Sequence, residues 1–250
     1  MRRGVPLRTR FGLLALAARR RLRPAQAYSL RVGAADVPVS HADYGVDWKT
    51  MQTIIVDRAY EFDYRGAVVV DVGAHKGCYG AYALAHGARA VVSYEPEETN
   101  YGYLEACAAG VRRSGQNWRT HRAAVAAEAG TADLHVMSSS WGHALAPSER
   151  SAEDEIAVER VPTVAMAEVL AEASGLAGTG RLLVKVNAEG AECDIVLGTP
   201  AASWRRADVV LMEVHSWAPC TLADLVSHLA DAELASLPPG SVDWVHRLSR

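Results

Sequence analysis

The stretch VVVDVGAHKGCYG, residues 68–80, decides the fold of this 250-residue chain. Three consecutive valines lead into Asp71, as is typical of a strand buried on both faces of a sheet. Two glycines, Gly73 and Gly77, follow four positions apart, where a chain can turn tightly from a strand into a helix. The sequence therefore predicts a strand–turn–helix unit with a carboxylate at the end of its strand.

The segments around this unit alternate between strand and helix. Apolar, β-branched runs occupy residues 67–70, 90–94, 181–186 and 208–214. Helical patterns occupy residues 79–86, 98–110, 164–173, 191–197 and 221–232. Residues 118–137 predict two short strands around a turn at 128–130, and residues 233–248 predict a closing hairpin. This alternation predicts right-handed βαβ units and one doubly wound α/β domain with a mostly parallel sheet.

Composition limits the chain to one sizeable core, since 50% of its residues are hydrophobic. No apolar run approaches the roughly 18 residues that cross a bilayer. The net charge is −3, yet residues 1–23 contain eight arginines and no acid. We interpret residues 1–27 as a basic N-terminal arm with a helix over 6–22, and residues 28–250 as the folded domain. The helix is expected to be solvated and to pack on the domain or bridge a homodimer; a patch for nucleic acid, anionic lipid or a phosphorylated substrate is not favoured.

The four cysteines are widely separated and include no CxxC pair and no zinc-type spacing with histidine. We therefore expect Cys78, Cys107, Cys193 and Cys220 to be ordinary thiols in a reducing cytoplasm.

The glycine turn indicates which ligand the sheet holds, because ligands of doubly wound sheets bind beyond the carboxyl ends of the strands. A dinucleotide site has GxGxxG and presents helix amides to a pyrophosphate, whereas the spacing here is D-x-G-x-x-x-G, and Asp71 would repel a diphosphate. Glu95 ends the next strand, where a carboxylate accepts the hydroxyls of a ribose. These residues outline a nucleoside site without a phosphate cradle, which fits S-adenosylmethionine and makes an NAD oxidoreductase the least favoured function.

Four blocks in this order resemble the FkbM-type S-adenosylmethionine-dependent methyltransferases: VVVDVGAHKGCYG, VVSYEPEETNYGYLEA, LLVKVNAEGAECDIVLGT and DVVLMEVHSW. The resemblance covers residues 47–232 and implies the seven-stranded, Rossmann-like class I methyltransferase fold. It implies methylation of a hydroxyl on a small molecule such as a sugar or natural product. It also implies a cofactor site: Asp71, Gly73 and Gly77 at the methionine end, Glu95 at the ribose, Ala123 and Ala124 at the adenine edge, with His75 and Asn187 nearby.

One departure from the family concerns the segment after the fourth core strand. The family commonly has D-x-E-G-A-E, whereas this chain has NAEGAE at residues 187–192. An amide at Asn187 removes an anionic ligand, so we expect no Mg²⁺ site, although Asn187 remains a catalytic candidate. Glu189 is assigned to acceptor binding. For Glu192 a simple role as a helix-dipole or capping partner is left open.

A hydroxyl is a poor nucleophile, so the reaction calls for a base. The sequence MEVHSW places Glu213 and His215 at the carboxyl edge of the sheet on one side of the chain. His215 is the leading base because its ordinary pKa suits proton uptake near neutrality; a histidine bonded to local backbone remains the alternative. Trp141 and His143 lie in a predicted loop at this edge and, with Tyr44, are candidates for acceptor recognition.

Two other functions stay open from the sequence. One is a 2′-O-methyltransferase of RNA or a nucleoside that uses the arginine-rich arm on phosphates. The other is a module that binds S-adenosylmethionine without catalysis, which the amide at Asn187 suggests.

Overall fold

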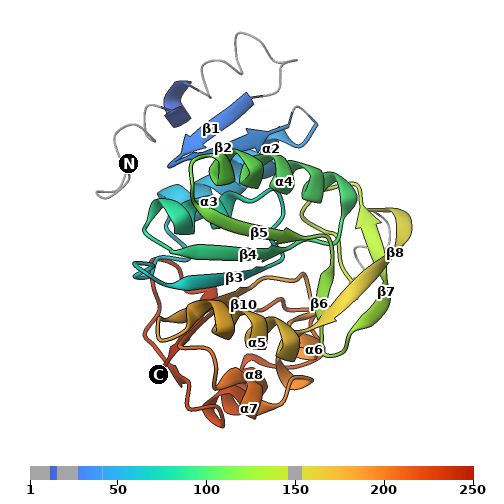
Figure 1. The fold of residues 1–250 in the computed structure, drawn as a ribbon. Coiled ribbons are helices and arrows are strands. Elements are labelled where there is room, and N and C mark those ends of the chain that lie inside the picture. Colours follow the sequence, from blue (N-terminus) through green and yellow to red (C-terminus); the bar gives the residue numbers. More distant parts are fainter. Residues whose placement is uncertain (1–11, 16–27, 41, 146–153) are drawn as a thin grey trace.

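The computed structural model describes residues 12–15, 28–40, 42–145 and 154–250. Its centre is a seven-stranded sheet with the strand order β11-β12-β10-β9-β3-β4-β5 (Figure 1). In chain order these strands are β3 (Val68–Val72), β4 (Ala90–Tyr94), β5 (Asn117–His121), β9 (Leu182–Val186), β10 (Val209–Glu213), β11 (Ala235–Ser236) and β12 (Val245–Ser249). The predicted doubly wound α/β fold is confirmed.

The five strands from β10 to β5 are parallel, and β12 pairs antiparallel with both β10 and β11, so only β12 runs against the other strands of this sheet. β12 lies between β10 and β11, so the predicted closing hairpin extends the sheet at one edge. The strand order reverses between β3 and β9, which are neighbours although more than 100 residues separate them. In this fold class, ligands bind at such a switch point.

Alternate residues of β3, β4, β9 and β10 enter two different cores. Val69 packs with residues of α3 (Cys78–Ala85) and α4 (Glu98–Arg113), whereas Val68 and Val70 pack with residues of α5 (Met166–Ala177), α6 (Glu192–Leu197) and α8 (Leu222–Ala230). Figure 1 shows the two groups of helices on opposite sides of the sheet, with the short α7 (Ala201–Trp204) beside α8. Since both faces are covered, the strands read as continuous apolar runs.

All five predicted helices begin within two residues of the observed ones, and three of them also end within two residues, but other elements were not anticipated. β1 (Tyr28–Val32) and β2 (Ala35–Val39) form a hairpin, followed by α2 (Tyr44–Met51) and the π-helix η1 (Gln52–Val56). The region after β5 forms a separate three-stranded sheet of β6 (Ala124–Ala126), β7 (Gly130–Met137) and β8 (Glu155–Ala165). The turn at 128–130 was placed correctly. β8 was missed, and the helix predicted from residue 164 begins at Met166, because β8 is largely exposed and lacks a buried apolar run.

The expectation of four free thiols is wrong for two of the cysteines. Cys193 and Cys220 form a disulfide that links α6 to the segment before α8. Cys78 and Cys107 are free and buried, as expected. Disulfides are rare in reducing compartments, so the thiols no longer support a cytoplasmic location. The described helices include none that is long and apolar enough to span a membrane.

Most of the basic arm falls outside the described residues, so its extent and role stay predictions. Residues 12–15 are helical, and Leu13 is buried against the domain while Leu14 is exposed.

The turn after β3 predicts a specific sensitivity to substitution. Gly73 has φ +72°, and a Cβ there would lie 1.8 Å from the carbonyl oxygen of Asn187. We expect Gly73→Ala to lower the free energy of unfolding by about 3 kcal/mol or more, measured by urea denaturation, because strain and overlap add. Gly102→Ala is the control: this exposed glycine of α4 has no atom within 4 Å of the added Cβ, so alanine should be neutral or stabilising. Equal effects of the two substitutions would contradict this account.

Candidate active site

The carboxyl ends of four neighbouring strands lie level with one another. In the sheet register, Val72 of β3 pairs with Tyr94 of β4 on one side and with Val186 of β9 on the other. Val186 in turn pairs with Met212 of β10. The residues that directly follow these ends therefore meet at one edge: the glycine turn 73–77, Glu95, Asn187, Glu213 and His215.

Asp71 and Lys185 form a buried ion pair beneath this edge. The two side chains are 0% and 4% exposed, and Lys185 Nζ lies 3.0 Å from Asp71 Oδ1. Lys185 also donates to the carbonyls of Val72 at 2.9 Å and Gly73 at 2.7 Å. Asp71 was predicted to meet the methionine end of the cofactor. In the structure its carboxylate pairs with the ammonium group that bonds the start of the glycine turn, and its assignment to the cofactor stays a prediction.

The glycine turn satisfies its own amides. The N–H groups of Gly73 and Ala74 both donate to the carbonyl of Tyr94, and that of Gly77 donates to Ala74. The N–H of His75 donates to Glu95 Oε2 at 2.8 Å. These four amides are therefore not presented to a phosphate, in agreement with the absence of GxGxxG.

Gly77 has a packing role. It has φ +88°, and an added Cβ would lie 3.0 Å from Leu104 and 3.2 Å from Trp118. The glycine thus allows α3 to start close to α4 and β5, with no described contact toward the ligand edge.

Glu95 lies buried directly after β4. Its Oε2 accepts the N–H of His75 and its Oε1 accepts the N–H of Glu97 at 3.1 Å. Burial, which disfavours the charged form, raises the pKa of Glu95 to about 7, although both backbone hydrogen bonds act in the opposite direction. Each carboxylate oxygen keeps further acceptor capacity, so Glu95 can accept hydroxyl groups of a ligand.

The two alanines predicted at the adenine edge differ in their surroundings. Ala123 is buried in the short connection between β5 and β6, and the neighbouring carbonyl of His121 accepts the N–H of Glu95 at 3.1 Å. Ala124 starts β6, and its side chain packs with Leu134 and Val136 in the core of the small sheet. Ala123 is therefore the better placed of the two.

His215 lies among three carboxylates. Its Nδ1 is 3.0 Å from Glu192 Oε1, and its Nε2 is 3.4 Å from Glu189 Oε2 and 4.0 Å from Glu213 Oε1. Burial lowers the pKa of His215, but the hydrogen bond to Glu192 and the charges of the three carboxylates outweigh it, so the pKa is raised. The alternative of a histidine bonded to local backbone is not what the structure shows.

Glu192 is fully buried and is fixed from two sides. Its Oε1 accepts the N–H of Ala188 at 2.9 Å and lies 3.0 Å from His215 Nδ1, and its Oε2 accepts the N–H of Gly190 at 3.0 Å. It is thus both a partner of the turn before α6 and the group that orients the imidazole. Glu189 has φ +50°, and burial raises its pKa to about 7.

Asn187 joins β9 to β10 through Glu213. Its Nδ2 donates to Glu213 Oε2 at 2.9 Å, and the hydroxyl of Tyr60 donates to the same oxygen at 3.0 Å. Burial, and then the charge of Glu213, raises the pKa of Tyr60, so the phenol remains a donor. Oδ1 of Asn187 is buried and accepts no hydrogen bond from the described residues. An orphaned acceptor of this kind suits a ligand that brings an N–H or O–H group.

The loop after β7 closes over the glycine turn. Ser140 Oγ lies 3.0 Å from His75 Nε2, and Asn100 donates to the carbonyl of Ser140 at 3.2 Å. Burial lowers the pKa of His75, which keeps its ring neutral. Trp141 donates from its indole nitrogen to Thr50 Oγ1 of α2 at 2.8 Å, and its side chain is exposed. The loop and α2 therefore form one wall above the turn.

The other two predicted acceptor residues belong to the same wall. Tyr44 stacks on Trp48 within α2, with ring centroids 6.2 Å apart. His143 accepts the N–H of Met137 at its Nδ1, and burial lowers its pKa. Its ring thus holds the loop to β7 rather than pointing freely outward.

Sequence reasoning missed several residues of this region. Lys76, inside the glycine turn, is buried and pairs with Asp47 at 2.8 Å and Asp43 at 3.1 Å, which anchors α2. The two aspartates, four residues apart on one helix face, were a usable signal. Lys185 inside a buried strand was another, since it requires a buried partner. The sequence gave no signal for Tyr60, because its partner Glu213 lies 153 positions away.

Within the part of the chain that the structure describes, no group of three or more histidine, cysteine, aspartate or glutamate side chains is arranged to hold a metal ion. The prediction that the reaction needs no metal remains to be tested by experiment.

The fold is similar to that of known methyltransferase structures. A methyltransferase FkbM from Methylobacillus flagellatus KT is 12% identical with a TM-score of 0.50; the match covers 84% of this chain and 53% of that one, so this chain spans about half its length. A putative RNA methyltransferase from Pyrococcus horikoshii is 11% identical with a TM-score of 0.44, and the match covers 97% of this chain and 99% of that one. A magnesium protoporphyrin IX methyltransferase from Synechocystis with bound S-adenosylmethionine is 12% identical with a TM-score of 0.39, and the match covers 99% of this chain and 98% of that one.

At 12% identity, the Methylobacillus flagellatus structure shows a shared fold only, and nothing is inferred from the two with TM-scores below 0.5. No curated protein matches the chain in sequence. The family model described as the methyltransferase FkbM domain, however, matches residues 71–231, which is well over half of the chain. That span runs from the end of β3 to the end of α8 and includes Glu95, Asn187 and His215. The chain therefore belongs to the FkbM methyltransferase family.

Proposed function

We propose that this methyltransferase transfers the methyl group of S-adenosylmethionine to a hydroxyl of a small molecule, with His215 as the base. The acceptor class we favour is a sugar, a nucleoside or a natural-product intermediate, which places the enzyme in natural-product biosynthesis. The observation that carries the proposal is the buried Glu192–His215 pair at the edge where Glu95 and Asn187 also lie. A cytoplasmic location stays a prediction.

The polar groups of the edge fit S-adenosylmethionine. Glu95 can accept the two ribose hydroxyls, and Ala123 is placed for the adenine edge. Asn187 Oδ1 lacks a donor and suits the ammonium group of the methionine end. A diphosphate would be repelled by Glu95, and the amides of the glycine turn already donate to protein acceptors, so they cannot bind it. S-adenosylmethionine supplies a methyl group on a sulfonium, which is already activated for displacement.

His215 is oriented for proton uptake. Glu192 accepts from Nδ1–H, so the lone pair of the neutral ring resides on Nε2, which lies between Glu189 and Glu213. A hydroxyl proton that passes to Nε2 creates an imidazolium, and the three carboxylates stabilise that charge. Glu213 is held by Tyr60 and Asn187, so it supports the imidazolium and is not itself free to move.

For the acceptor, we assign Trp141 and Tyr44 as an aromatic wall and Glu189 as a hydrogen-bonding partner. Trp141 is 41% exposed and is fixed to α2 by its bond to Thr50. Glu189, with a pKa of about 7, can donate or accept near neutrality. His143 stays a candidate for acceptor binding, and its Nδ1 also positions the loop by accepting the N–H of Met137.

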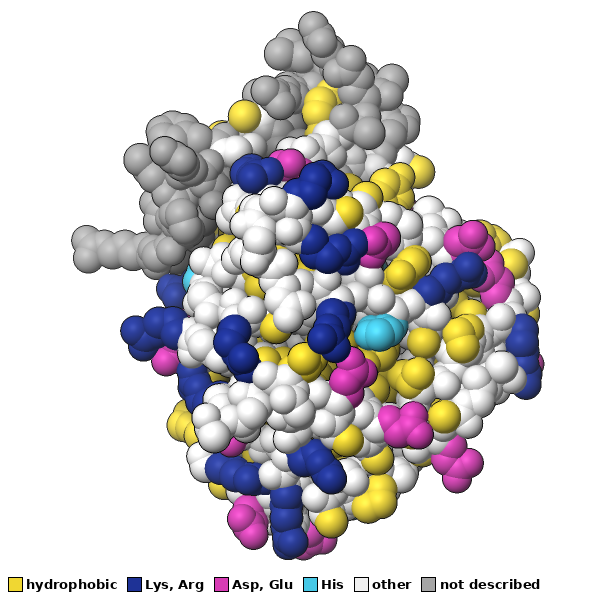
Figure 2. All heavy atoms as spheres, viewed as in Figure 1, with side chains coloured by type: hydrophobic (Ala, Val, Ile, Leu, Met, Phe, Trp, Pro, Cys, Tyr) yellow, Lys and Arg dark blue, Asp and Glu magenta, His cyan; other side chains and the backbone are white. Residues whose placement is uncertain are grey.

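No observation on the described residues favours the alternative of an RNA substrate. Basic and acidic side chains are interspersed on the face shown in Figure 2, rather than gathered into a basic patch. The arginine-rich arm lies largely outside the described residues.

An acceptor screen with labelled S-adenosylmethionine tests the reaction class. We expect methyl transfer to hydroxylated small molecules, and we expect the rate to be unchanged by EDTA because Asn187 supplies an amide where a metal site would use a carboxylate. Activity that disappears with EDTA and returns with Mg²⁺ would refute the metal-free mechanism. Transfer to RNA alone would refute the small-molecule acceptor.

Cofactor affinity should depend on pH through Glu95. Its pKa of about 7 means that the carboxylate, the better acceptor for hydroxyls, forms as pH rises from 6 to 8. Calorimetry should therefore show tighter S-adenosylmethionine binding at pH 8 than at pH 6. Glu95→Gln should bind at least about tenfold more weakly and lose the contribution of this group to the pH dependence. Glu98→Gln, on the exposed start of α4, is the matched control and should behave as the wild type. A pH profile shared by all three proteins would exclude Glu95.

Removal of the base should separate binding from turnover. His215→Ala is expected to lower kcat by roughly 10²-fold or more while S-adenosylmethionine still binds, because the imidazole acts on the acceptor. In the wild type, kcat should rise with pH through a value above the ordinary pKa of histidine, since the base must first lose its proton. His246→Ala, on β12 outside this cluster, is the control. An unchanged kcat in His215→Ala would remove it as the base.

A further inference from the structure

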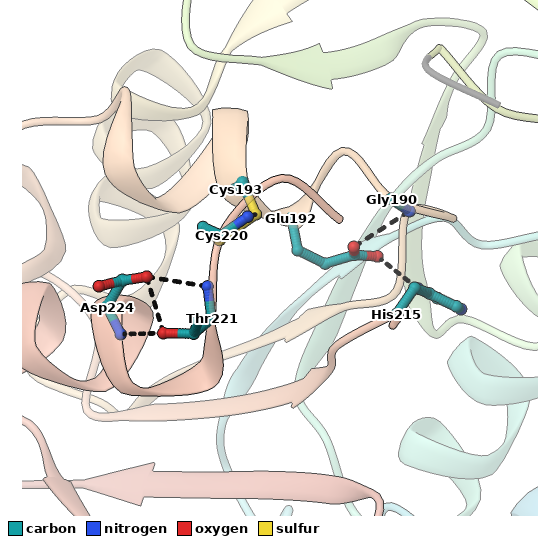
Figure 3. The surroundings of a disulfide bond; sticks show 7 residues. All are labelled: Gly190, Glu192, Cys193, His215, Cys220, Thr221 and Asp224. Atoms are coloured by element: carbon teal, nitrogen blue, oxygen red, sulfur yellow. Dashed lines mark hydrogen bonds and ion pairs between the residues drawn. A yellow bond between two sulfur atoms is a disulfide. The ribbon is translucent and has the colours of Figure 1, made fainter. Parts of the chain in front are cut away.

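The disulfide lies beside the pair of residues that we assign to proton transfer. Cys193 directly follows Glu192 in α6, and Cys220 lies five residues after His215, immediately before α8. Figure 3 shows the disulfide next to the bond between Glu192 and His215, which come from the same two segments. The covalent link therefore joins the segment that carries the carboxylate to the segment that carries the imidazole.

The loop at 214–220 packs on the core at its two ends, through Val214 and Cys220, while its middle is largely exposed. Ser216, Trp217 and Pro219 are exposed. Within the loop, the N–H of Ala218 donates to the carbonyl of His215, and the Trp217 ring lies against the imidazole with centroids 4.6 Å apart. These two contacts are internal to the loop, whereas the bond of His215 to Glu192 and the packing of Val214 and Cys220 connect it to the rest of the domain. The disulfide supplies a covalent tie at its far end.

The elements on either side of the loop are anchored independently. Glu192 is fully buried and bonded to the amides of Ala188 and Gly190, so its position does not require the disulfide. Thr221 and Asp224 form a capping box at the start of α8 (Figure 3), which stabilises that helix end independently of the disulfide. Loss of the disulfide is thus expected to release His215 and not Glu192.

We propose that the Cys193–Cys220 disulfide positions His215 against Glu192, so that breaking it slows methyl transfer and leaves cofactor binding intact. The effect on turnover rests on the proposed role of His215 as the base; the positioning itself does not. A dithiol reductant such as dithiothreitol breaks the disulfide. Its two thiols give two electrons and two protons, the S–S bond breaks, both protein sulfurs become thiols, and the reductant closes to a cyclic disulfide.

The charges around His215 make its pKa a measure of where the ring lies. Glu189 and Glu192 face the ring from the segment at the start of α6, Glu213 faces it from β10, and Trp217 covers it from the loop. Burial lowers the pKa of His215, and the bond to Glu192 raises it. A ring that leaves Glu192 therefore loses its proton at lower pH. A change that affected only stability would not move this titration.

The test compares two double variants. Cys193→Ala/Cys220→Ala removes the disulfide, and Cys78→Ala/Cys107→Ala removes the two buried free thiols as a matched control. Three measurements follow on each protein: the titration of the His215 ring by NMR, the affinity for S-adenosylmethionine by calorimetry, and kcat against pH with the acceptor found by the screen. Wild type treated with dithiothreitol, then reoxidised, gives the same comparison without substitution if the double variant does not fold.

Without the disulfide, we expect a lower pKa of His215, a fall in kcat of roughly tenfold or more, a rising limb of the kcat–pH profile at lower pH, and unchanged cofactor affinity. Reoxidation of the reduced wild type should restore the pKa, kcat and pH profile, and the control variant should match the wild type. A His215 titration that is the same with and without the disulfide overturns the proposal. A lowered pKa with unchanged turnover would keep the positioning and instead refute His215 as the base.

Discussion

The buried ion pair between Asp71 and Lys185 is the constraint on which the rest of the site depends. It joins β3 to β9 where the order of the sheet reverses, and Lys185 also bonds two carbonyls at the start of the glycine turn. A charge buried this deeply is costly unless it is paired, so neither residue can lose its partner without a large penalty. The pair thereby fixes the path of the turn, and through the turn it places His75 next to Glu95.

The carboxylates of the edge differ in role because their partners differ. Asp71 neutralises a lysine, whereas Glu95 accepts two backbone amides and keeps capacity for a ligand. Glu192 accepts two amides and orients His215, and Glu213 is held by two neutral donors from distant segments. Burial without a cationic partner is what brings the pKa of Glu95 to about 7. One sheet edge thus supplies a structural anchor, a ligand acceptor and a base–carboxylate pair.

The predictions that failed share a physical cause, which is contact between segments far apart in the chain. Cys193 and Cys220 looked like isolated thiols, and only the return of the loop after β10 toward α6 brings them together. The ion pair of Asp71 with Lys185 was not anticipated because the two residues lie more than 100 positions apart, and only the pairing of β3 with β9 makes them neighbours. β8 was missed because its residues are largely exposed, so the hydrophobic pattern that marks the core strands is absent from it.

By itself, the sequence determined the alternation of buried strands and helices, the glycine turn after Val72, the acid at the end of β4 and membership of the FkbM methyltransferase family. These features depend on local residue patterns, and local patterns report burial and backbone conformation directly. Tertiary structure alone decided which polar groups became partners: Lys185 with Asp71, Glu192 with His215, and Tyr60 and Asn187 with Glu213. Strand register and strand order bring these partners together, and neither can be read from the pattern of neighbouring residues.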